Sequence, residues 1–170
     1  MIELLILHTL SKHSFTMYSI KKEIETVFSA LSIPSFGAIK PALKKLEKLE
    51  CIKSGKLMSD GGKLSIYYTI TAKGKERLRE LLLEDFSQNP SNFFLNARLK
   101  LAMSEHLKGE EKRRLFLIIK SLALRFKNGT SENRDSGGFY YQMVLDNIAC
   151  EYANLITLVE ALEKENARNS

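Results

Sequence analysis

The chain has 170 residues, of which 44% are hydrophobic and 27% charged, a composition typical of a soluble globular protein with one ordinary domain or two small ones. Its longest apolar runs fall far short of the roughly 20 residues that a membrane span needs, so we expect no membrane partner. The net charge of +6 is carried by residues 1–80, which hold 14 Lys and Arg against 8 Asp and Glu, whereas residues 81–170 hold 12 of each sign. This asymmetry is typical of a nucleic-acid-binding module joined to a second module, although charge alone favours plain solvation equally.

Helical periodicity predicts three helices in the first 50 residues. The first spans Ile2 to Leu10, and the second begins after Thr16, a candidate N-cap, and ends before Pro34. The third covers residues 35–50, with Ser35 as its candidate N-cap. One face of this third helix is apolar and carries Ile39, Leu43, Leu46 and Leu49. Another face is a basic ridge formed by Lys40, Lys44 and Lys48.

After residue 50 the period of the pattern changes from that of a helix to that of a strand. Residues 51–58 and 64–71 read as two strands around an Asp60-Gly61 turn, which predicts a β-hairpin. Thr71 is the candidate N-cap of a fourth helix. Three helices, a hairpin and a following helix make a winged helix-turn-helix, which we assign to residues 1–86.

The polar segment at residues 87–92 is the expected domain boundary. Beyond it the pattern predicts helices at 93–107 and 110–126, a loop at 127–138 and a long helix at 139–165, all within a second domain at 93–167. The predicted fold class is therefore mainly α with a small β-hairpin: a winged helix-turn-helix domain followed by an α-helical dimerisation domain.

The last predicted helix carries an apolar seam that alternates three and four residues over three heptads: Leu145, Ile148, Tyr152, Leu155, Val159 and Leu162. Such a seam often packs inside its own monomer. We favour dimerisation here, because Ala149, Ile156 and Leu158 widen the stripe beyond what two short companion helices cover. A methionine and aromatic cluster at the start of the helix is more typical of core than of a ligand pocket: Phe139, Tyr140, Tyr141 and Met143.

A helix-turn-helix binds duplex DNA by laying its second helix in the major groove, and residues 35–50 fit that role. At the N-terminus of this helix we expect base-edge contacts from Ser35, Phe36, Gly37 and Ala38. Phosphate contacts are expected from Lys21, Lys22, Lys40, Lys44, Lys45, Lys48, Lys56 and Lys63. An exposed lysine row is usually a solvated face, but its coincidence with a helix-turn-helix and a basic wing favours DNA contact.

The sequence offers little support for an enzyme. It lacks the GxGxxG, GxxxxGK[ST], HExxH and GxSxG motifs, and its histidines have no obvious partner in sequence: His8, His13 and His106. Cys51 and Cys150 lie far apart and form no metal-binding pattern, so we expect two plain thiols, no metal and no cofactor. Glu3 stands where a signal peptide carries basic residues, so a cytoplasmic location is expected.

Three stretches resemble the winged-helix domain of PadR-family transcriptional regulators: MYSIKKEIE, PSFGAIKPALKKLEKLECIKSG and GGKLSIYYTITAKGKERL. The positions that match the family pattern are Tyr18, Ile20, Gly37, Pro41, Leu43, Leu46, Glu47, Tyr67, Tyr68, Thr71 and Gly74. The later half is similar to the C-terminal helical (Vir-like) dimerisation domain of the longer members. The resemblance implies a homodimeric repressor on a near-palindromic operator, with a small-molecule effector often altering the dimer.

The sequence departs from the family pattern at Met17 and Cys51, where glycines are usual, and at Lys40, where a tyrosine is usual. At position 40, lysine replaces a hydroxyl that can bond to a phosphate with a cation that can do so with more charge. The operator sequence of the family is therefore not expected to apply to this chain. The competing interpretation is a winged-helix module that binds another protein, with its lysines only solvating the surface. Salt-dependent affinity for duplex DNA separates the two, because a protein-interaction module has no phosphates to neutralise.

Overall fold

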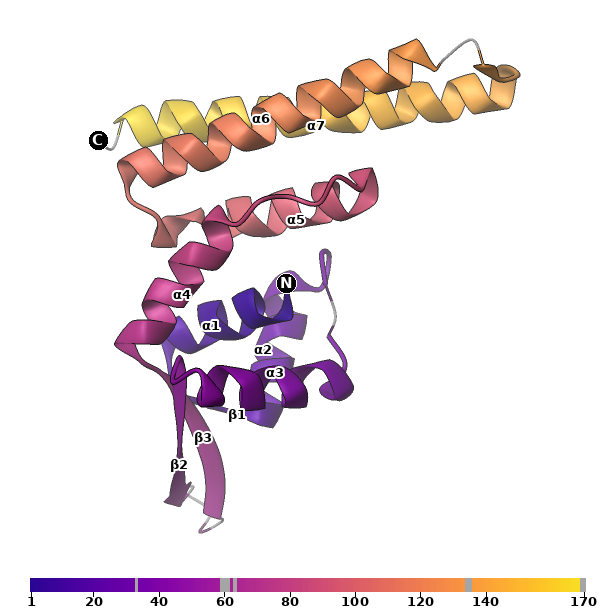
Figure 1. Cartoon of the computed structure of the whole chain (residues 1–170). Helices are drawn as coiled ribbons and strands as arrows, with labels where there is room; N and C mark the ends of the chain where they lie inside the picture. Colours follow the sequence, from indigo (N-terminus) through magenta and orange to yellow (C-terminus); the bar gives the residue numbers. More distant parts are fainter. Residues whose placement is uncertain (33, 59–61, 63, 134–135, 169–170) are drawn as a thin grey trace. The chain divides into compact units, whose positions relative to one another are not determined.

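The computed structural model describes residues 1–32, 34–58, 62, 64–133 and 136–168 (Figure 1). Contacts divide the chain into two compact units. Unit 1 comprises residues 1–86 and 94–106, and unit 2 comprises residues 87–93 and 107–170. Within the described residues, none of the helices combines the length and apolar character that crossing a membrane would require.

Unit 1 begins with three helices, as the periodicity predicted: α1 (Ile2–Lys12), α2 (Met17–Phe28) and α3 (Phe36–Lys48). The two predicted N-caps are confirmed, since the side chain of Thr16 accepts a hydrogen bond from the Ser19 backbone N–H and that of Ser35 accepts one from Ala38. Helix α1 packs against both other helices, and its apolar residues from Leu4 to Leu10 are almost fully buried. The core of unit 1 therefore lies around α1.

A three-stranded antiparallel sheet completes the winged helix (Figure 1). Strands β2 (Ile52–Met58) and β3 (Leu64–Ile70) form the predicted hairpin, with Ile52 opposite Ile70 and Met58 opposite Leu64. A third strand that the sequence did not predict, β1 (Phe15–Thr16), pairs with β3. A strand is recognised in a sequence by the alternation of apolar and polar residues, and two residues are too few to show that alternation.

The turn from α3 into β2 forms a Schellman motif, in which Glu50 N–H bonds to the Glu47 carbonyl and Cys51 N–H bonds to the Leu46 carbonyl. Glu50 occupies the left-handed position of this motif, with φ of 60°. Because the helix ends at Lys48, Leu49 is its C-cap and is 41% exposed. The prediction that Leu49 belongs to the apolar face was therefore wrong.

Helix α4 (Ala72–Leu83) starts against the backbone of that same turn. The predicted N-cap, Thr71, accepts a hydrogen bond from the Gly74 N–H and donates to the Cys51 carbonyl at 3.0 Å. A Cβ at position 74 would lie 1.9 Å from the Cys51 carbonyl oxygen. Glycine at this position is what allows α4 to approach the end of α3 so closely.

Helix α5 (Pro90–Ala102) and a 3₁₀ turn, η1 (Ser104–His106), follow the segment at 87–89. Residues 94–106 group with unit 1, whereas the sequence analysis assigned 93–167 to one second domain. Two contacts contribute to this grouping: the buried Lys100 ammonium donates to the Glu84 carbonyl, and His106 meets His8 of α1. Burial lowers the pKa of Lys100 to about 8.

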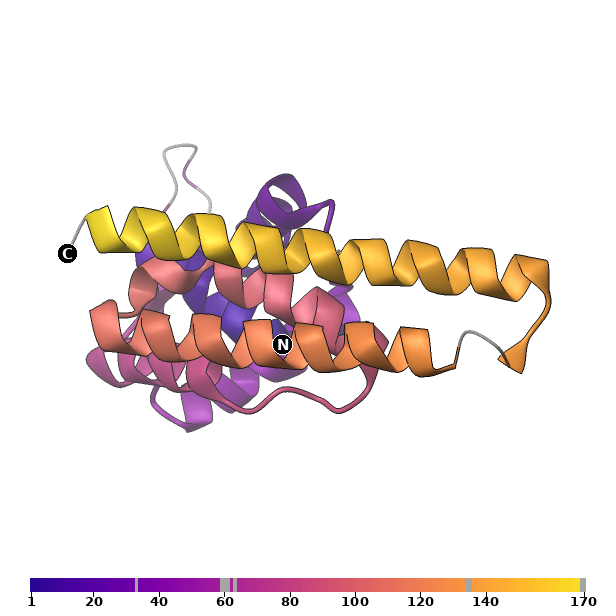
Figure 2. The same cartoon turned by 90° about the horizontal axis from the view of Figure 1, so that it is seen from above.

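Unit 2 is dominated by two long antiparallel helices, α6 (Gly109–Glu132) and α7 (Phe139–Arg168), which lie side by side in both views (Figures 1 and 2). Its core includes Phe93, Ala123 and Tyr152, and the Phe126 ring stacks on Tyr152 with centroids 5.8 Å apart. An ion pair between Lys120 and Glu160, 2.8 Å, also joins the two helices.

The loop predicted at 127–138 was wrong for its first half, because α6 continues to Glu132. The polar sequence there contains no proline, and its side chains bond to the helix backbone. Thr130 donates to the Lys127 carbonyl, and Asn133 donates to the Gly129 carbonyl. Packing against α7 stabilises a segment whose own propensity is weak, which is how tertiary contacts override local preference.

Candidate functional site

The outward face of α3 carries the residues that the sequence selected. Ser35, Phe36, Gly37 and Ala38 are all exposed at the N-terminus of the helix. The opposite face is buried against the core through Ile39, Ala42, Leu43 and Leu46. The structure therefore brings together a helix N-terminus with small side chains and an open surface that a groove of DNA can approach.

The lysines of α3 differ in their surroundings. Lys40, Lys44 and Lys48 are exposed, and no carboxylate of the described residues lies within ion-pair distance of them. Lys45 instead pairs with Glu3 of α1 at 2.5 Å. We define the row as Lys40, Lys44 and Lys48, because these three present charge that no described side chain neutralises.

Helix α2 adds an aromatic and cationic cluster beside the start of α3. The Lys21 ammonium lies 5.0 Å from the centroid of the Phe36 ring and pairs with Glu25, whereas Lys22 is exposed. Tyr18 stacks on Phe36 with ring centroids 6.3 Å apart and is 67% exposed. The sequence analysis missed Tyr18 as a site residue, although an exposed aromatic next to a basic helix is a signal for nucleic-acid contact.

The hairpin presents fewer of the predicted cations. Lys56 is exposed on β2, and Lys53, which the sequence analysis did not select, is exposed as well. The predicted contact at Lys63 lies outside the described residues. Several apolar side chains of the hairpin are also about half exposed or more: Leu57, Met58, Leu64 and Ile66.

The predicted seam of α7 is largely occupied within its own chain. Tyr152, Leu155 and Val159 are buried, whereas Leu145, Ile148 and Leu162 are half-buried. The aromatic cluster that the pattern assigned to the core is exposed instead: Phe139, Tyr140, Tyr141 and Met143. Further exposed apolar side chains on α6 and α7 lie outside the seam: Leu117, Leu124, Val144 and Leu158.

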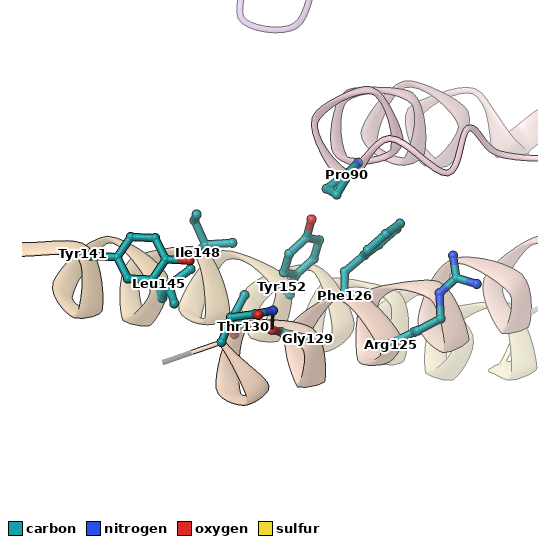
Figure 3. Close-up of a pocket in the computed structure, with 10 residues that line it drawn as sticks. Pro90, Arg125, Phe126, Gly129, Thr130, Tyr141, Leu145, Ile148 and Tyr152 are labelled. Atoms are coloured by element: carbon teal, nitrogen blue, oxygen red, sulfur yellow. Dashed lines mark hydrogen bonds between the residues drawn. The ribbon is translucent and has the colours of Figure 1, made fainter. Parts of the chain in front are cut away.

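Unit 2 contains a pocket of about 340 Å³ between α6, α7 and the start of α5 (Figure 3). Most of its lining residues are apolar or aromatic: Pro90, Phe126, Tyr141, Leu145, Ile148 and Tyr152. The others follow one another along α6 and its C-cap: Arg125, Gly129, Thr130 and Asn133. Burial raises the pKa of the Tyr152 hydroxyl. An apolar cleft with one cation fits a flat organic molecule with an acceptor or anionic group.

Comparison with known proteins identifies the first half of the chain. Residues 6–80 match the family described as the transcriptional regulator PadR-like family, so unit 1 carries a PadR-like domain. This match confirms the resemblance seen in the first 80 residues of the sequence. No curated protein sequence matches the chain.

Solved structures with a similar fold include three that cover almost the whole chain. Bacillus subtilis PadR in complex with operator DNA is 19% identical, with 96% of each chain covered and a TM-score of 0.46. The PadR-like transcriptional regulator BC1756 from Bacillus cereus is 17% identical, with 100% of each chain covered and a TM-score of 0.40. The Vibrio cholerae virulence activator AphA is 16% identical, with 100% of each chain covered and a TM-score of 0.42.

Proposed function

We propose that this chain, whose unit 1 carries a PadR-like domain, is a transcriptional regulator that binds a specific DNA operator as a homodimer and represses transcription from it. The observation that carries the proposal is the row of Lys40, Lys44 and Lys48, exposed and free of ion pairs with described carboxylates, on the helix that a winged helix-turn-helix lays in the major groove.

In the proposed complex, α3 enters the major groove with its N-terminus first. Ser35, Gly37 and Ala38 are small enough for their backbone to approach base edges and phosphates. The row neutralises phosphates, and the Tyr18 and Phe36 pair supplies flat apolar surface next to it. Lys22 and Lys56 extend the contact to the flanking backbone, so affinity depends strongly on salt.

The proposed dimer uses exposed apolar positions of the long helices. Val144 and Leu158 lie two heptads apart on α7, and Leu117 and Leu124 lie one heptad apart on α6, so each pair forms a stripe. A two-fold dimer then presents two α3 helices to half-sites about one helical turn apart, which matches a near-palindromic operator. The seam residues Leu145, Ile148 and Leu162 lie within four residues of Val144 or Leu158 in the sequence. They are half-buried, so only part of each side chain can contact a second copy.

The dimer surface is tested by Leu158→Asp, which we expect to yield folded monomers with weakened operator affinity. Leu155→Asp is the comparison, because Leu155 is 2% exposed and a buried charge there should unfold unit 2. Light scattering measures the mass of each variant, and circular dichroism measures its helix content. A folded Leu158→Asp dimer would refute the proposed surface.

A small-molecule effector is the remaining part of the proposal. The pocket of unit 2 suits a flat, largely apolar molecule whose acceptor group faces Arg125. Since Tyr141, Leu145 and Ile148 of α7 line the pocket, an occupant contacts the helix that the proposed dimer uses. Binding there is expected to change the dimer and hence the spacing of the two α3 helices.

Fluorescence anisotropy with the duplex upstream of the protein's own coding region, beside a scrambled duplex of equal length, tests the DNA proposal. We expect the native duplex to be preferred from about 50 to 200 mM salt, with a log–log slope of roughly −5 or steeper from three row lysines in each of two protomers. In vitro transcription from the same duplex should decrease as the protein is added. No binding to either duplex at the lowest salt would instead favour the protein-interaction module, which the exposed apolar hairpin also fits.

A further inference from the structure

Two histidines that are 98 residues apart in sequence meet inside unit 1. The Nδ1 atom of His8 lies 2.9 Å from the Nε2 atom of His106, with the two rings nearly perpendicular at 76°. A carboxylate oxygen of Glu105 lies 3.8 Å from the same Nε2 atom. One donor atom from each of these three residues lies within 4.8 Å of the others.

This set of donors matches a transition-metal site. Zinc binds imidazole nitrogen at about 2.0–2.1 Å and carboxylate oxygen at about 2.0–2.2 Å, so tetrahedral geometry puts donor atoms about 3.3 Å apart. The nitrogen pair is within a few tenths of an ångström of that separation. The Glu105 side chain is 67% exposed, so it can move the remaining distance by rotation without disturbing the core.

The contact between the two rings leaves their facing nitrogens available to an ion. In a hydrogen bond between two imidazoles, one facing nitrogen carries the proton and the other accepts it. When an ion binds both facing nitrogens, that proton moves to the other nitrogen of its own ring, so both rings stay neutral and each offers one lone pair.

The cluster is both held in place and reachable. His8 is 4% exposed on α1, and its ring packs edge-on against Phe28 with centroids 5.5 Å apart, which fixes its orientation. His106 lines a hollow of about 310 Å³ together with Ser11, Lys75, Leu78 and Arg79. This hollow gives an ion a route to the nitrogens and leaves room for a water molecule as the fourth ligand.

We propose that His8, Glu105 and His106 form a binding site for a divalent transition metal of the zinc type, with water completing the coordination. The ion bridges α1, which lies at the centre of the winged helix, to η1 at the end of α5. None of its three residues is among the proposed DNA contacts, and none lies on α2, α3 or the hairpin.

The test is calorimetric titration of the untagged, chelator-treated full chain with Zn²⁺, in a Cys150→Ser background because Cys150 is an exposed thiol. We expect one ion per chain and a raised melting temperature. Glu105→Gln should weaken affinity by at least roughly tenfold, the lower end of what even outer-shell changes produce. His106→Gln should abolish saturable binding, and Co²⁺ should show the visible absorption of a tetrahedral site only where His106 is present.

His13→Gln is the matched control, because His13 is the third histidine, is exposed and lies outside the cluster. It should leave stoichiometry and affinity unchanged. The absence of saturable binding in the parent chain would overturn the proposal. So would binding that survives both Glu105→Gln and His106→Gln, or binding that His13→Gln removes, since either result would mean that the ion sits elsewhere. Circular dichroism of each variant excludes loss of the fold as the cause.

Discussion

Two adjacent lysines of α3 allow a sharp test of the proposed DNA contact. Lys44 is exposed and faces no described carboxylate at ion-pair distance, whereas Lys45 pairs with Glu3 at 2.5 Å. Each phosphate neutralised by a lysine contributes about 0.9 to the slope of log affinity against log salt. Lys44→Ala should therefore flatten the slope by about 1.8 for a dimer, so that the affinity lost between 50 and 200 mM salt shrinks by about twelvefold.

Lys45→Ala should flatten the slope by less than half as much, because Glu3 already offsets that charge. Lys164→Ala makes the same change in net charge on α7, which the proposal does not place against DNA, and should leave the slope unaltered. Anisotropy titrations of the three variants and the parent on one duplex, at four or more salt concentrations, give the slopes directly. Equal changes for Lys44→Ala and Lys45→Ala, or no change for Lys44→Ala, would refute the assignment of the row to phosphates.

Three further predictions concern stability, measured by equilibrium urea unfolding. Gly74→Ala should lower the free energy of unfolding by about 3 kcal/mol, because its Cβ would lie 1.9 Å from the Cys51 carbonyl oxygen, whereas Gly109→Ala, with open space around it, should change it by less than about 1 kcal/mol. Glu50→Gly should raise it by about 1 kcal/mol by removing a side chain from a φ of 60°; a decrease would contradict strain there. Lys100 has a pKa of about 8 when folded against 10.5 when unfolded, so between these pH values the unfolded chain holds the extra proton. Stability of the parent should therefore rise by up to about 3 kcal/mol across that window relative to Lys100→Met, and parallel pH profiles would contradict this.

Local signals predicted much of the fold of unit 1. The caps at Thr16, Ser35 and Thr71 and the strand alternation each act within a few residues, so they can be read without knowing what lies across the core. The first half of the predicted 127–138 loop shows the limit of this approach. The polar residues before Glu132 are helical because α7 packs beside them, and no local pattern contains that contact.

The candidate site also combines features that local spacing predicts with contacts between distant residues that it does not predict. Exposure of the row followed from helical spacing, because residues opposite an apolar face point outward. The pairing of Lys45 with Glu3 spans 42 residues, and the meeting of His8 with His106 spans 98. Neither contact has a sequence signature. The ion pair with Glu3 weakens the phosphate contact expected of Lys45, and the contact between His8 and His106 forms a cluster where the sequence suggested isolated histidines.

The long C-terminal helix shows why an apolar repeat does not identify its partner. A heptad seam requires a facing helix, but the physics of packing is the same whether that helix belongs to the same chain or to another. Here α6 buries Tyr152, Leu155 and Val159, so the centre of the seam is satisfied within the protomer. Leu158 and Val144 lie outside that centre and are about half exposed. The dimer proposal therefore depends on these two positions, which widen the apolar stripe, and not on the seam itself.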